Sequence, residues 1–487
     1  MILLAPLALA FILGLSVVAL LTHRVALPQK FLFGMSVALP LGFGIASLLL
    51  FWSYVIAAPQ VKVVMPALTA LLLLGILVRH IRLRSFQDLI HFMRHGLPQF
   101  KTTLQTWDPR GKSLSGNLNK GFTLAAAAFY GFMAWHYGRY FTGRIVWNIW
   151  GGWDAQYFWN LKAKFLFRDP AQWTGMFSPI LSWSHPDYPL LLPGTLAWGW
   201  HLAGHEFLLW APAVDFVFFV SLNLFVVWYL GTAVSWISGF LTGGYLLSVP
   251  VYRFWSTTQY ADIPLAYFFT TAAVLLLLAL RTRALKLFFF AGLMAGLSAW
   301  TKNEGLFYLG WLGLLLTVAL LRGKNLDSPK LPRLVWFIAG ILIAFSAVLY
   351  AKVFLGLEGG EYLGSGRNLA EYIKALFFDS LKTRIIAGSF WVYLPNYSQW
   401  HGLWLLFLTA WLLGGRRTYQ EYRWIPGVLV LLIEAGYFIV LHWAPNEIYF
   451  QISVSMLRLL MHAGALALVF AVEAAGPLRL KDHPDAC

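Results

Sequence analysis

The sequence contains almost no cysteine and little charge, and each shortage excludes a class of protein. Cys487 is the only cysteine, which excludes a disulfide framework and a cluster of thiolate metal ligands. Charged residues make up 11% of the 487 residues, whereas globular domains average about 25%. Because hydrophobic residues make up 59%, lipid tails rather than water must surround most of this chain.

Nucleotide-binding signatures are also missing. The chain has no G-x-x-x-x-G-K-S/T segment and no G-x-G-x-x-G segment after a strand-like run. It has no soluble domain large enough to bind a nucleotide, so any chemistry must use a substrate that is activated before it arrives. The formal net charge of +16 does not indicate nucleic-acid binding. The basic residues fall in short loops between apolar runs, where they encode membrane orientation.

Apolar runs that can cross about 30 Å of hydrocarbon recur along the whole chain. They predict an all-α polytopic membrane protein. The candidate spans are residues 2–22, 31–57, 61–79, 121–141, 188–205, 207–230, 232–250, 262–280, 287–301, 303–321, 334–355, 399–415, 424–442 and 453–473. Long loops cover residues 80–120, 142–187 and 356–398, and the last of these begins with a glycine-rich stretch.

Loop charge predicts which side of the membrane each loop occupies. Loop 80–120 is rich in lysine and arginine and should be cytoplasmic, which places loop 142–187 outside, one span later. Four candidate spans separate 142–187 from the basic residues at 281–286, but the number of crossings between opposite sides must be odd. We expect the Pro- and Gly-rich segment 188–205 not to cross fully. This gives about 13 crossings and places every polar cluster described below on the outer side.

The first polar cluster begins at Asp154, after a Gly-Gly pair. If residues 154–167 are helical, they form a short helix with an aromatic-rich side and a lysine side, which suits the membrane interface. Asp154 could simply cap this helix. It could also be a carboxylate at the lipid boundary that acts as a general base.

The second cluster, His185 and Asp187, closes the same loop. Its prolines favour a turn that leads into a membrane segment. The two side chains could instead bind sugar hydroxyls or a metal ion, although two ligands alone do not make a metal site.

The third and fourth clusters lie at the ends of apolar segments. Asp262 begins one span and could cap its helix ahead of Pro264. Lys302, Asn303 and Glu304 form a very tight polar connection between two apolar segments. The Lys-Glu pair could be a surface ion pair, but its closeness to hydrocarbon favours a functional role.

The fifth cluster is Arg458 with His462, four residues apart inside the last apolar run. Their spacing puts both on one face of a helix. An arginine inside a membrane segment indicates a functional site, and its guanidinium matches the oxygens of a lipid phosphate. Snorkelling to the interface is the alternative.

Taken together, these clusters resemble, in letters, order and spacing, the bacterial GT-C glycosyltransferases of the dolichyl-phosphate-mannose protein mannosyltransferase-like group. The resemblance covers roughly residues 121–470. Its motifs are Trp153–Lys164, His185–Pro193, Tyr260–Ala266 and Trp300–Gly305.

The resemblance implies a GT-C fold whose conserved block of seven membrane helices has a large first external loop. It divides the chain into an N-terminal three-span addition with a basic cytoplasmic loop, a seven-helix catalytic module, an external loop, and a C-terminal three-span module with a short cytoplasmic tail. These parts cover residues 1–120, 121–356, 357–398 and 399–487.

The resemblance also implies an activity, namely transfer of a sugar from a polyprenyl-phosphate carrier to an extracytoplasmic acceptor, usually with inversion. Asp154 would deprotonate or orient the acceptor hydroxyl, and Asp262 would be a second carboxylate near the same site. Arg458, Lys162 and Lys302 are candidates for binding the donor phosphate. The remaining candidates for substrate binding are His185, Asp187, Glu304 and His462.

No obligatory metal is expected, because the first loop has no Asp-x-Asp, although use of a divalent metal stays open. The expected location is a bacterial inner or plasma membrane, with the site facing outside or the periplasm. The expected partners are the donor, membrane lipids and a glycan, lipid or protein acceptor. Two other functions stay open: a lipid or solute transporter or flippase, and a non-catalytic subunit of an envelope polysaccharide system.

Overall fold

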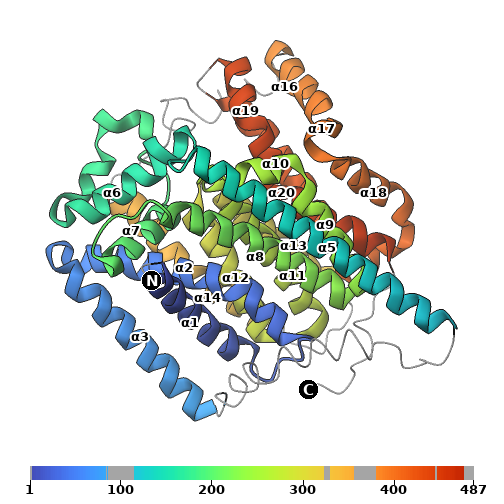
Figure 1. Cartoon of the computed structure of the whole chain (residues 1–487), viewed down its shortest axis with the longest axis horizontal. Coiled ribbons are helices and arrows are strands. Elements are labelled where there is room, and N and C mark those ends of the chain that lie inside the picture. The colour runs from blue at the N-terminus through green and yellow to red at the C-terminus, as the bar shows by residue number, and fades with distance from the viewer. Residues whose placement is uncertain are drawn as a thin grey trace.

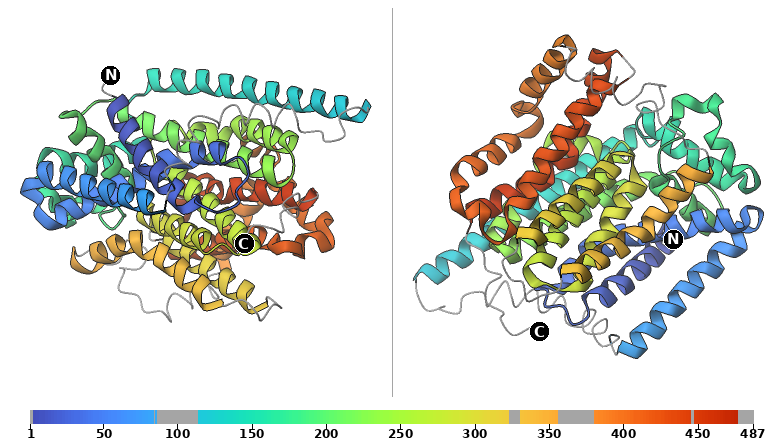
Figure 2. Two further views of the ribbon diagram at one scale, coloured as in Figure 1. Left: turned by 90° about the horizontal axis from the view of Figure 1, so that it is seen from below. Right: turned by 180° about the vertical axis from the view of Figure 1, so that it is seen from behind.

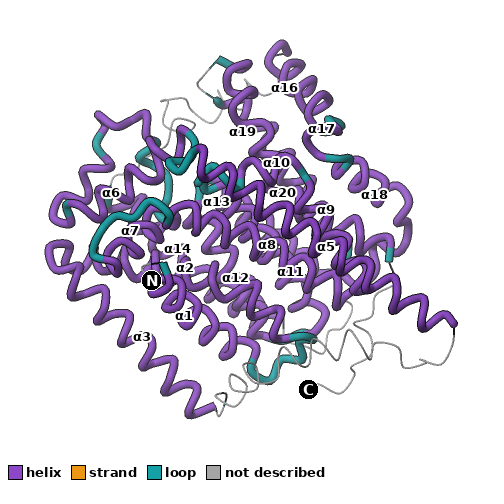
Figure 3. Tube along the Cα trace, viewed as in Figure 1, coloured by secondary structure: helices purple, strands orange, loops and turns teal. Residues whose placement is uncertain are grey.

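The structure is a helical bundle, and it confirms the all-α polytopic membrane class. The computed structural model describes residues 3–83, 85, 114–322, 330–355, 380–444 and 447–476. Over these ranges there is no strand (Figure 3). Eight helical segments in them are long and apolar enough to cross a membrane: Leu4–Thr22, Lys30–Leu83, Trp210–Ala233, Asp262–Thr282, Glu304–Arg322, Lys330–Phe354, Trp424–Trp443 and Ile448–Ala475.

The N-terminal part forms three helices, of which α1 and α2 pack closely. Their bounds are α1 (Leu4–Thr22), α2 (Lys30–Ala57) and α3 (Val61–Leu83). Gly14 and Gly42 allow the close contact, because a Cβ on either would meet a backbone oxygen of the other helix at 1.8 or 1.9 Å. Such small residues are what membrane helices use to approach one another. α3 lies at the edge of the bundle (Figure 1).

α5 (Leu114–Trp147) is longer than the span expected at 121–141. It runs along the outside of the bundle (Figure 2, left) and packs on α9. Residues 114–120 are therefore helical rather than part of loop 80–120. Residues 86–113 of that loop lie outside the described part of the chain.

The first large loop contains several short helices instead of one continuous α-helix over 154–167. They are the π-helical turn η2 (Ala155–Trp159), α6 (Asn160–Arg168), η3 (Pro170–Phe177) and η4 (Pro179–Ser184). A π turn holds more residues than an α turn, so it rotates α6 away from the expected register. Tyr157 on this turn is exposed, whereas Lys162 on α6 is buried.

α7 (Leu191–Ala203) lies beside only one half of α2. Near its start, Ser47 of α2 donates a hydrogen bond to the Leu190 carbonyl, and near its end His201 contacts Tyr54 of α2. Its 13 residues span about 20 Å, which is shorter than the hydrocarbon thickness of about 30 Å.

The centre of the bundle is α11, whose apolar segment is completely buried. The central helices are α8 (Trp210–Ala233), α9 (Trp236–Ser248), α10 (Pro250–Trp255), α11 (Asp262–Thr282), α12 (Leu285–Thr301), α13 (Glu304–Arg322) and α14 (Lys330–Phe354). The expected span 232–250 stops at Val249 because Pro250 starts a new helix. A turn over 256–261 then leads into α11.

The C-terminal part packs on this centre through α20, which contacts α11 along its length. Its helices are α16 (Ser380–Tyr393), α17 (Tyr397–Trp400), α18 (Leu403–Tyr419), α19 (Trp424–Trp443) and α20 (Ile448–Ala475). Within the loop expected over 356–398, residues 380–393 form the helix α16. Residues 356–379 lie outside the described ranges.

Two buried polar networks hold α11 to α20, one near each end of α11. At one end, Arg281 pairs with Glu473 at 2.6 Å, and Tyr229 of α8 hydrogen-bonds to both side chains. At the other end, Asp262 contacts Arg458 and His462. Because both pairs join the same two helices, they fix the register of α20 against α11 and thereby position Arg458.

Candidate active site

Asp262, in the first turn of α11, is the centre of the polar network. The N-cap of α11 is Ala261 rather than Asp262, so the capping alternative is wrong. The Asp262 carboxylate instead contacts three basic side chains: Lys302 Nζ at 3.0 Å, His462 Nε2 at 2.8 Å and Arg458 at 3.0 and 3.2 Å. The side chain is 0% exposed. Asp262 therefore contacts basic side chains from the end of α12 and from α20 in the interior of the bundle.

Arg458 connects this buried carboxylate to the surface. Its NH2 group lies 3.0 Å from Asp262 Oδ2 and 2.7 Å from Asp154 Oδ2. The Arg458 and Asp154 side chains are 15% and 14% exposed. The rings of Tyr260 and Trp255 lie 4.8 and 5.3 Å from the guanidinium carbon, where cation–π attraction holds it. The ion pair with Asp154 rules out the view that Arg458 merely snorkels.

Asp154 is held by its backbone, which leaves its carboxylate to Arg458. The residue precedes η2, but its side chain makes no capping bond, so the capping alternative is wrong here too. Its backbone N–H donates to the Tyr260 hydroxyl at 3.1 Å, and the Gly152 N–H donates to the Thr258 carbonyl at 2.9 Å. The loop that carries the expected base thus rests on the turn before α11.

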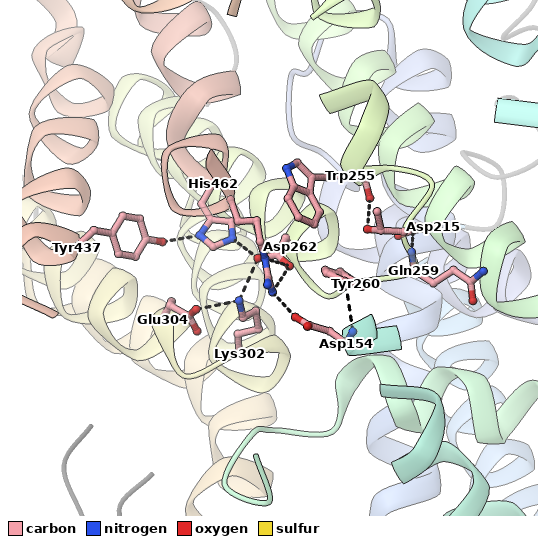
Figure 4. Close-up of polar contacts among 12 residues, drawn as sticks. Asp154, Asp215, Trp255, Gln259, Tyr260, Asp262, Lys302, Glu304, Tyr437 and His462 are labelled. Carbon is pink, nitrogen blue, oxygen red and sulfur yellow. Dashed lines mark hydrogen bonds and ion pairs between the residues drawn. The ribbon is translucent and has the colours of Figure 1, made fainter. Parts of the chain in front are cut away.

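Lys302 and Glu304 form an ion pair whose lysine is buried and whose carboxylate is partly exposed. Lys302 Nζ lies 2.8 Å from Glu304 Oε1 while it also contacts Asp262. Their side chains are largely shielded, and Glu304 Oε2 has no hydrogen-bond partner among the described residues. His462 extends the network on the other side of Asp262, where its Nδ1 lies 2.7 Å from the Tyr437 hydroxyl of α19. Figure 4 shows Asp154, Asp262, Lys302, Glu304 and His462 converging.

Lys162, His185 and Asp187 form a second cluster beside the first. Lys162 Nζ donates to the His185 carbonyl at 2.5 Å, and Asn303 Nδ2 donates to Asp187 Oδ2 at 2.6 Å. The Tyr188 ring lies 5.9 Å from Lys162 Nζ and 5.7 Å from Lys302 Nζ, so it separates the clusters. Burial lowers the pKa of Lys162 to about 7.

Several residues of the site received no role from sequence reasoning. Asp215 of α8 is buried beside the site, and its Oδ2 accepts a hydrogen bond from the Gln259 N–H at 2.6 Å. An aspartate inside the apolar run 207–230 was a usable signal, because charged residues inside membrane segments are rare and functional by default. Tyr260, Trp255 and Tyr437 gave no such signal, since aromatic residues are abundant throughout this chain.

The site places a guanidinium, a group that can bind an anion, beside a carboxylate. Asp154, Asp262 and Glu304 face Arg458 and Lys302, so with a neutral His462 the five charged groups sum to −1. Within the described ranges, no group of three or more His, Cys, Asp or Glu residues could hold a metal ion. Arg458, Asp154 and Glu304 are the partly exposed members, and Arg458 and Asp154 contact each other.

The comparisons with known proteins add no name to this arrangement. No protein-family model, no curated protein and no solved structure matches the chain.

Proposed function

We propose that this chain is a membrane glycosyltransferase that transfers a sugar from a polyprenyl-phosphate carrier to an extracytoplasmic acceptor, with inversion. The observation that carries this proposal is the 2.7 Å pair of Asp154 and Arg458. This pair joins a carboxylate that can take a proton to a guanidinium that can bind phosphate. Both side chains are partly exposed, as is that of Glu304, whereas Asp262, Lys302 and His462 are buried.

In the proposed reaction, the acceptor hydroxyl attacks the anomeric carbon of the donor. The bond between that carbon and the phosphate oxygen breaks, and polyprenyl phosphate leaves with the bonding electrons. Asp154 takes the hydroxyl proton as general base. Arg458 stabilises the charge that grows on the phosphate, where a preorganised guanidinium is most effective.

The ion pair implies an order of events. Arg458 NH2 contacts the carboxylates of Asp154 and Asp262 together, so a donor phosphate must replace one of them. Asp154 is the replaceable partner, because it is partly exposed whereas Asp262 is buried. Donor binding would then release Asp154, and the base becomes free only when there is a sugar to transfer.

The remaining candidates take supporting roles in this proposal. Asp262 was expected to be catalytic, but full burial and three basic partners favour a positioning role. Lys302 is already paired with two carboxylates, and Lys162 is 0% exposed. Both lysines are buried, whereas the Arg458 side chain is 15% exposed, so Arg458 is the proposed phosphate ligand.

The fold supports an outer location for this site. We propose the GT-C arrangement with about 13 crossings, which adds the shorter helices α9, α12 and α18 and the long α5 to the eight apolar segments and leaves α7 on one side. It counts α2 and α3 as separate crossings. The site lies at the start of α11. Arg281 lies at the other end of the helix, where the basic turn should face the cytoplasm.

A transporter or flippase is the second candidate, and one residue favours it. Glu434 lies within α19, and neither of its carboxylate oxygens has a hydrogen-bond partner among the described residues. An unpaired carboxyl group inside a membrane span is typical of ion and proton pathways. A transporter of this kind needs Glu434, whereas the proposed transferase needs Asp154.

Complementation of a deletion strain separates the two functions. Surface glycans and lipids are compared by mass spectrometry after expression of wild type, Asp154→Asn or Glu434→Gln at equal membrane levels. We expect deletion to remove one sugar, wild type and Glu434→Gln to restore it, and Asp154→Asn to lower transfer by about 100- to 10,000-fold. Full restoration by Asp154→Asn would contradict the transferase.

A further inference from the structure

The turn that precedes α11 contacts both reactive side chains of the site. The Tyr260 hydroxyl accepts the backbone N–H of Asp154 at 3.1 Å, and the Tyr260 ring lies 4.8 Å from the Arg458 guanidinium carbon. Gly152 allows the loop to approach Tyr260 closely, because a Cβ at this position would lie 2.4 Å from the Tyr260 hydroxyl. The position of Tyr260 therefore sets the distance between Asp154 and Arg458.

Gln259 joins this turn to the loop that carries Asp154. Its Nε2 donates to the Ile149 carbonyl at 2.8 Å, and its Oε1 accepts from Asn160 Nδ2 at 3.3 Å. These two contacts lie on either side of Asp154 in the chain. The backbone of Gln259 has a φ of +60°, a conformation that side-chain-bearing residues rarely adopt. Other contacts must therefore stabilise the backbone of Gln259 in this conformation.

Asp215 holds Gln259 in place from inside the bundle. Its Oδ2 accepts the Gln259 N–H at 2.6 Å, and its side chain is almost completely buried in α8. Its second oxygen, Oδ1, has no partner among the described residues. A buried carboxyl group with one unpaired oxygen costs free energy, so packing alone does not explain the aspartate. Figure 4 shows Asp215 and Gln259 side by side, with Tyr260 between them and the ion-pair network.

We infer that Asp215 and Gln259 are positioning residues that hold the Asp154 loop against Arg458. Asp215 fixes the turn, Gln259 ties the turn to both flanks of the loop, and Tyr260 transmits the position to the base and to the guanidinium. The catalytic meaning of this device depends on the proposed transferase. The placement itself can be tested without any activity.

The test is a nitroxide label on the loop. Trp150 lies between Ile149 and Gly151, is 52% exposed, and offers a surface site for Trp150→Cys in a Cys487→Ser background. The spin-label spectrum is recorded in nanodiscs for the labelled protein without further change, for Asp215→Leu, Asp215→Asn and Gln259→Gly, and for one control variant. Asp215→Asn keeps an oxygen that accepts the Gln259 N–H. Gln259→Gly keeps the backbone contact and suits the positive φ but removes both side-chain ties to the loop.

A matched control comes from the same helix. Asn223 of α8 is equally buried and hydrogen-bonds to Gly243 and Tyr130, which have no contact with the site. Asn223→Leu therefore removes buried hydrogen bonds from α8 without touching the turn. This variant shows how a general loss of stability changes the mobile fraction in the spin-label spectrum.

We expect Asp215→Leu and Gln259→Gly to increase the mobile fraction of the label, and Asp215→Asn and Asn223→Leu to leave it unchanged. If transfer is measurable, kcat should fall by about 100-fold in the first two variants, with little change in the donor KM, because the base is misplaced rather than the donor lost. An unchanged spectrum in Asp215→Leu, or an equal change in Asn223→Leu, would overturn the inference. Absence of transfer by every protein, with the expected spectra, would reject only the transferase.

Discussion

At the scale of single residues, Lys162 shows how strongly burial can act on a charge outside the membrane spans. Its side chain is 0% exposed, and its Nζ donates to the neutral carbonyl of His185. Asp187 is the nearby acid, but its Oδ2 accepts from Asn303. Desolvation of the Lys162 ammonium therefore outweighs its attraction to Asp187 and lowers the pKa of Lys162 to about 7.

A lowered lysine pKa makes stability depend on pH in a definite direction. Between the folded value of about 7 and the ordinary value of 10.5, the unfolded chain binds a proton that the folded chain does not. The free energy of unfolding contributed by Lys162 therefore rises with pH over this interval and is lowest below about pH 7. We expect the temperature at the unfolding midpoint of wild type to be higher at about pH 9 than at about pH 7. Lys162→Met should reduce this difference.

The measurement is thermal unfolding followed by tryptophan fluorescence in detergent at each pH. Lys164→Met is the control, because Lys164 lies on the same short helix but is partly exposed. It should keep the pH dependence of wild type. An identical dependence in wild type and Lys162→Met would show that the ammonium is not desolvated as described.

Sequence reasoning found the charged members of the site because charge is rare in this chain. Arg458 and His462 were placed on one helix face by their spacing, and both contact Asp262. Their partner could not be predicted, because Asp262 lies almost two hundred residues earlier in the chain and only the folded bundle joins them. Asp215 was overlooked, although the same rule about charges in apolar runs applied to it.

At the scale of helices, the crossing of α12 and α14 depends on glycine. A Cβ at Gly292 of α12 would meet the Phe337 carbonyl oxygen at 2.0 Å, and a Cβ at Gly340 of α14 would meet the Phe289 carbonyl oxygen at 2.0 Å. The two backbones therefore touch where both side chains are absent. α12 ends at Thr301, next to Lys302, so this crossing also sets the depth of one cation of the site.

Alanine at Gly292 should loosen this crossing. The extra methyl group must push the helices apart, at a cost of about 1–3 kcal/mol. In α13, a Cβ at Gly313 would meet nothing within 4 Å, so Gly313→Ala should be neutral or stabilise by up to about 1 kcal/mol through helix propensity. Unfolding midpoints of the two variants test this contrast. Equal effects would contradict the reported packing.

Helix boundaries were predicted well where hydrophobicity sets them and poorly where other forces do. The predicted span 31–57 matches α2 closely, because the polar residues Gln29 and Lys30 mark its start and Pro59 follows its end. α5 extends well beyond 121–141 into sequence whose polarity favoured a loop. The π turn at 155–159 could not be predicted from periodicity, because it changes the period itself. Lys162 follows that turn and is buried, which periodicity could not predict either.

At the scale of the whole molecule, the charges separate along α11. Asp262 and the acidic part of the site lie at its first residue, whereas Arg281 lies in its last turn, followed by Arg283 and Lys286. The 21 residues of α11 span about 30 Å, one hydrocarbon thickness. A helix of this length can therefore reach both membrane surfaces, and we propose that its basic end faces the cytoplasm.

This argument predicts the orientation of the active site. In a Cys487→Ser background, Trp150→Cys places a thiol in the first large loop, and Thr282→Cys places one at the exposed basic end of α11. A membrane-impermeant maleimide applied to intact cells should modify Trp150→Cys and should reach Thr282→Cys only after the membrane is opened. The reverse pattern would put the Asp154–Arg458 pair in the cytoplasm. A lipid-linked donor on the outer leaflet could then not reach that pair, so this result would refute the extracytoplasmic transferase even if the helix bundle were correct in every contact.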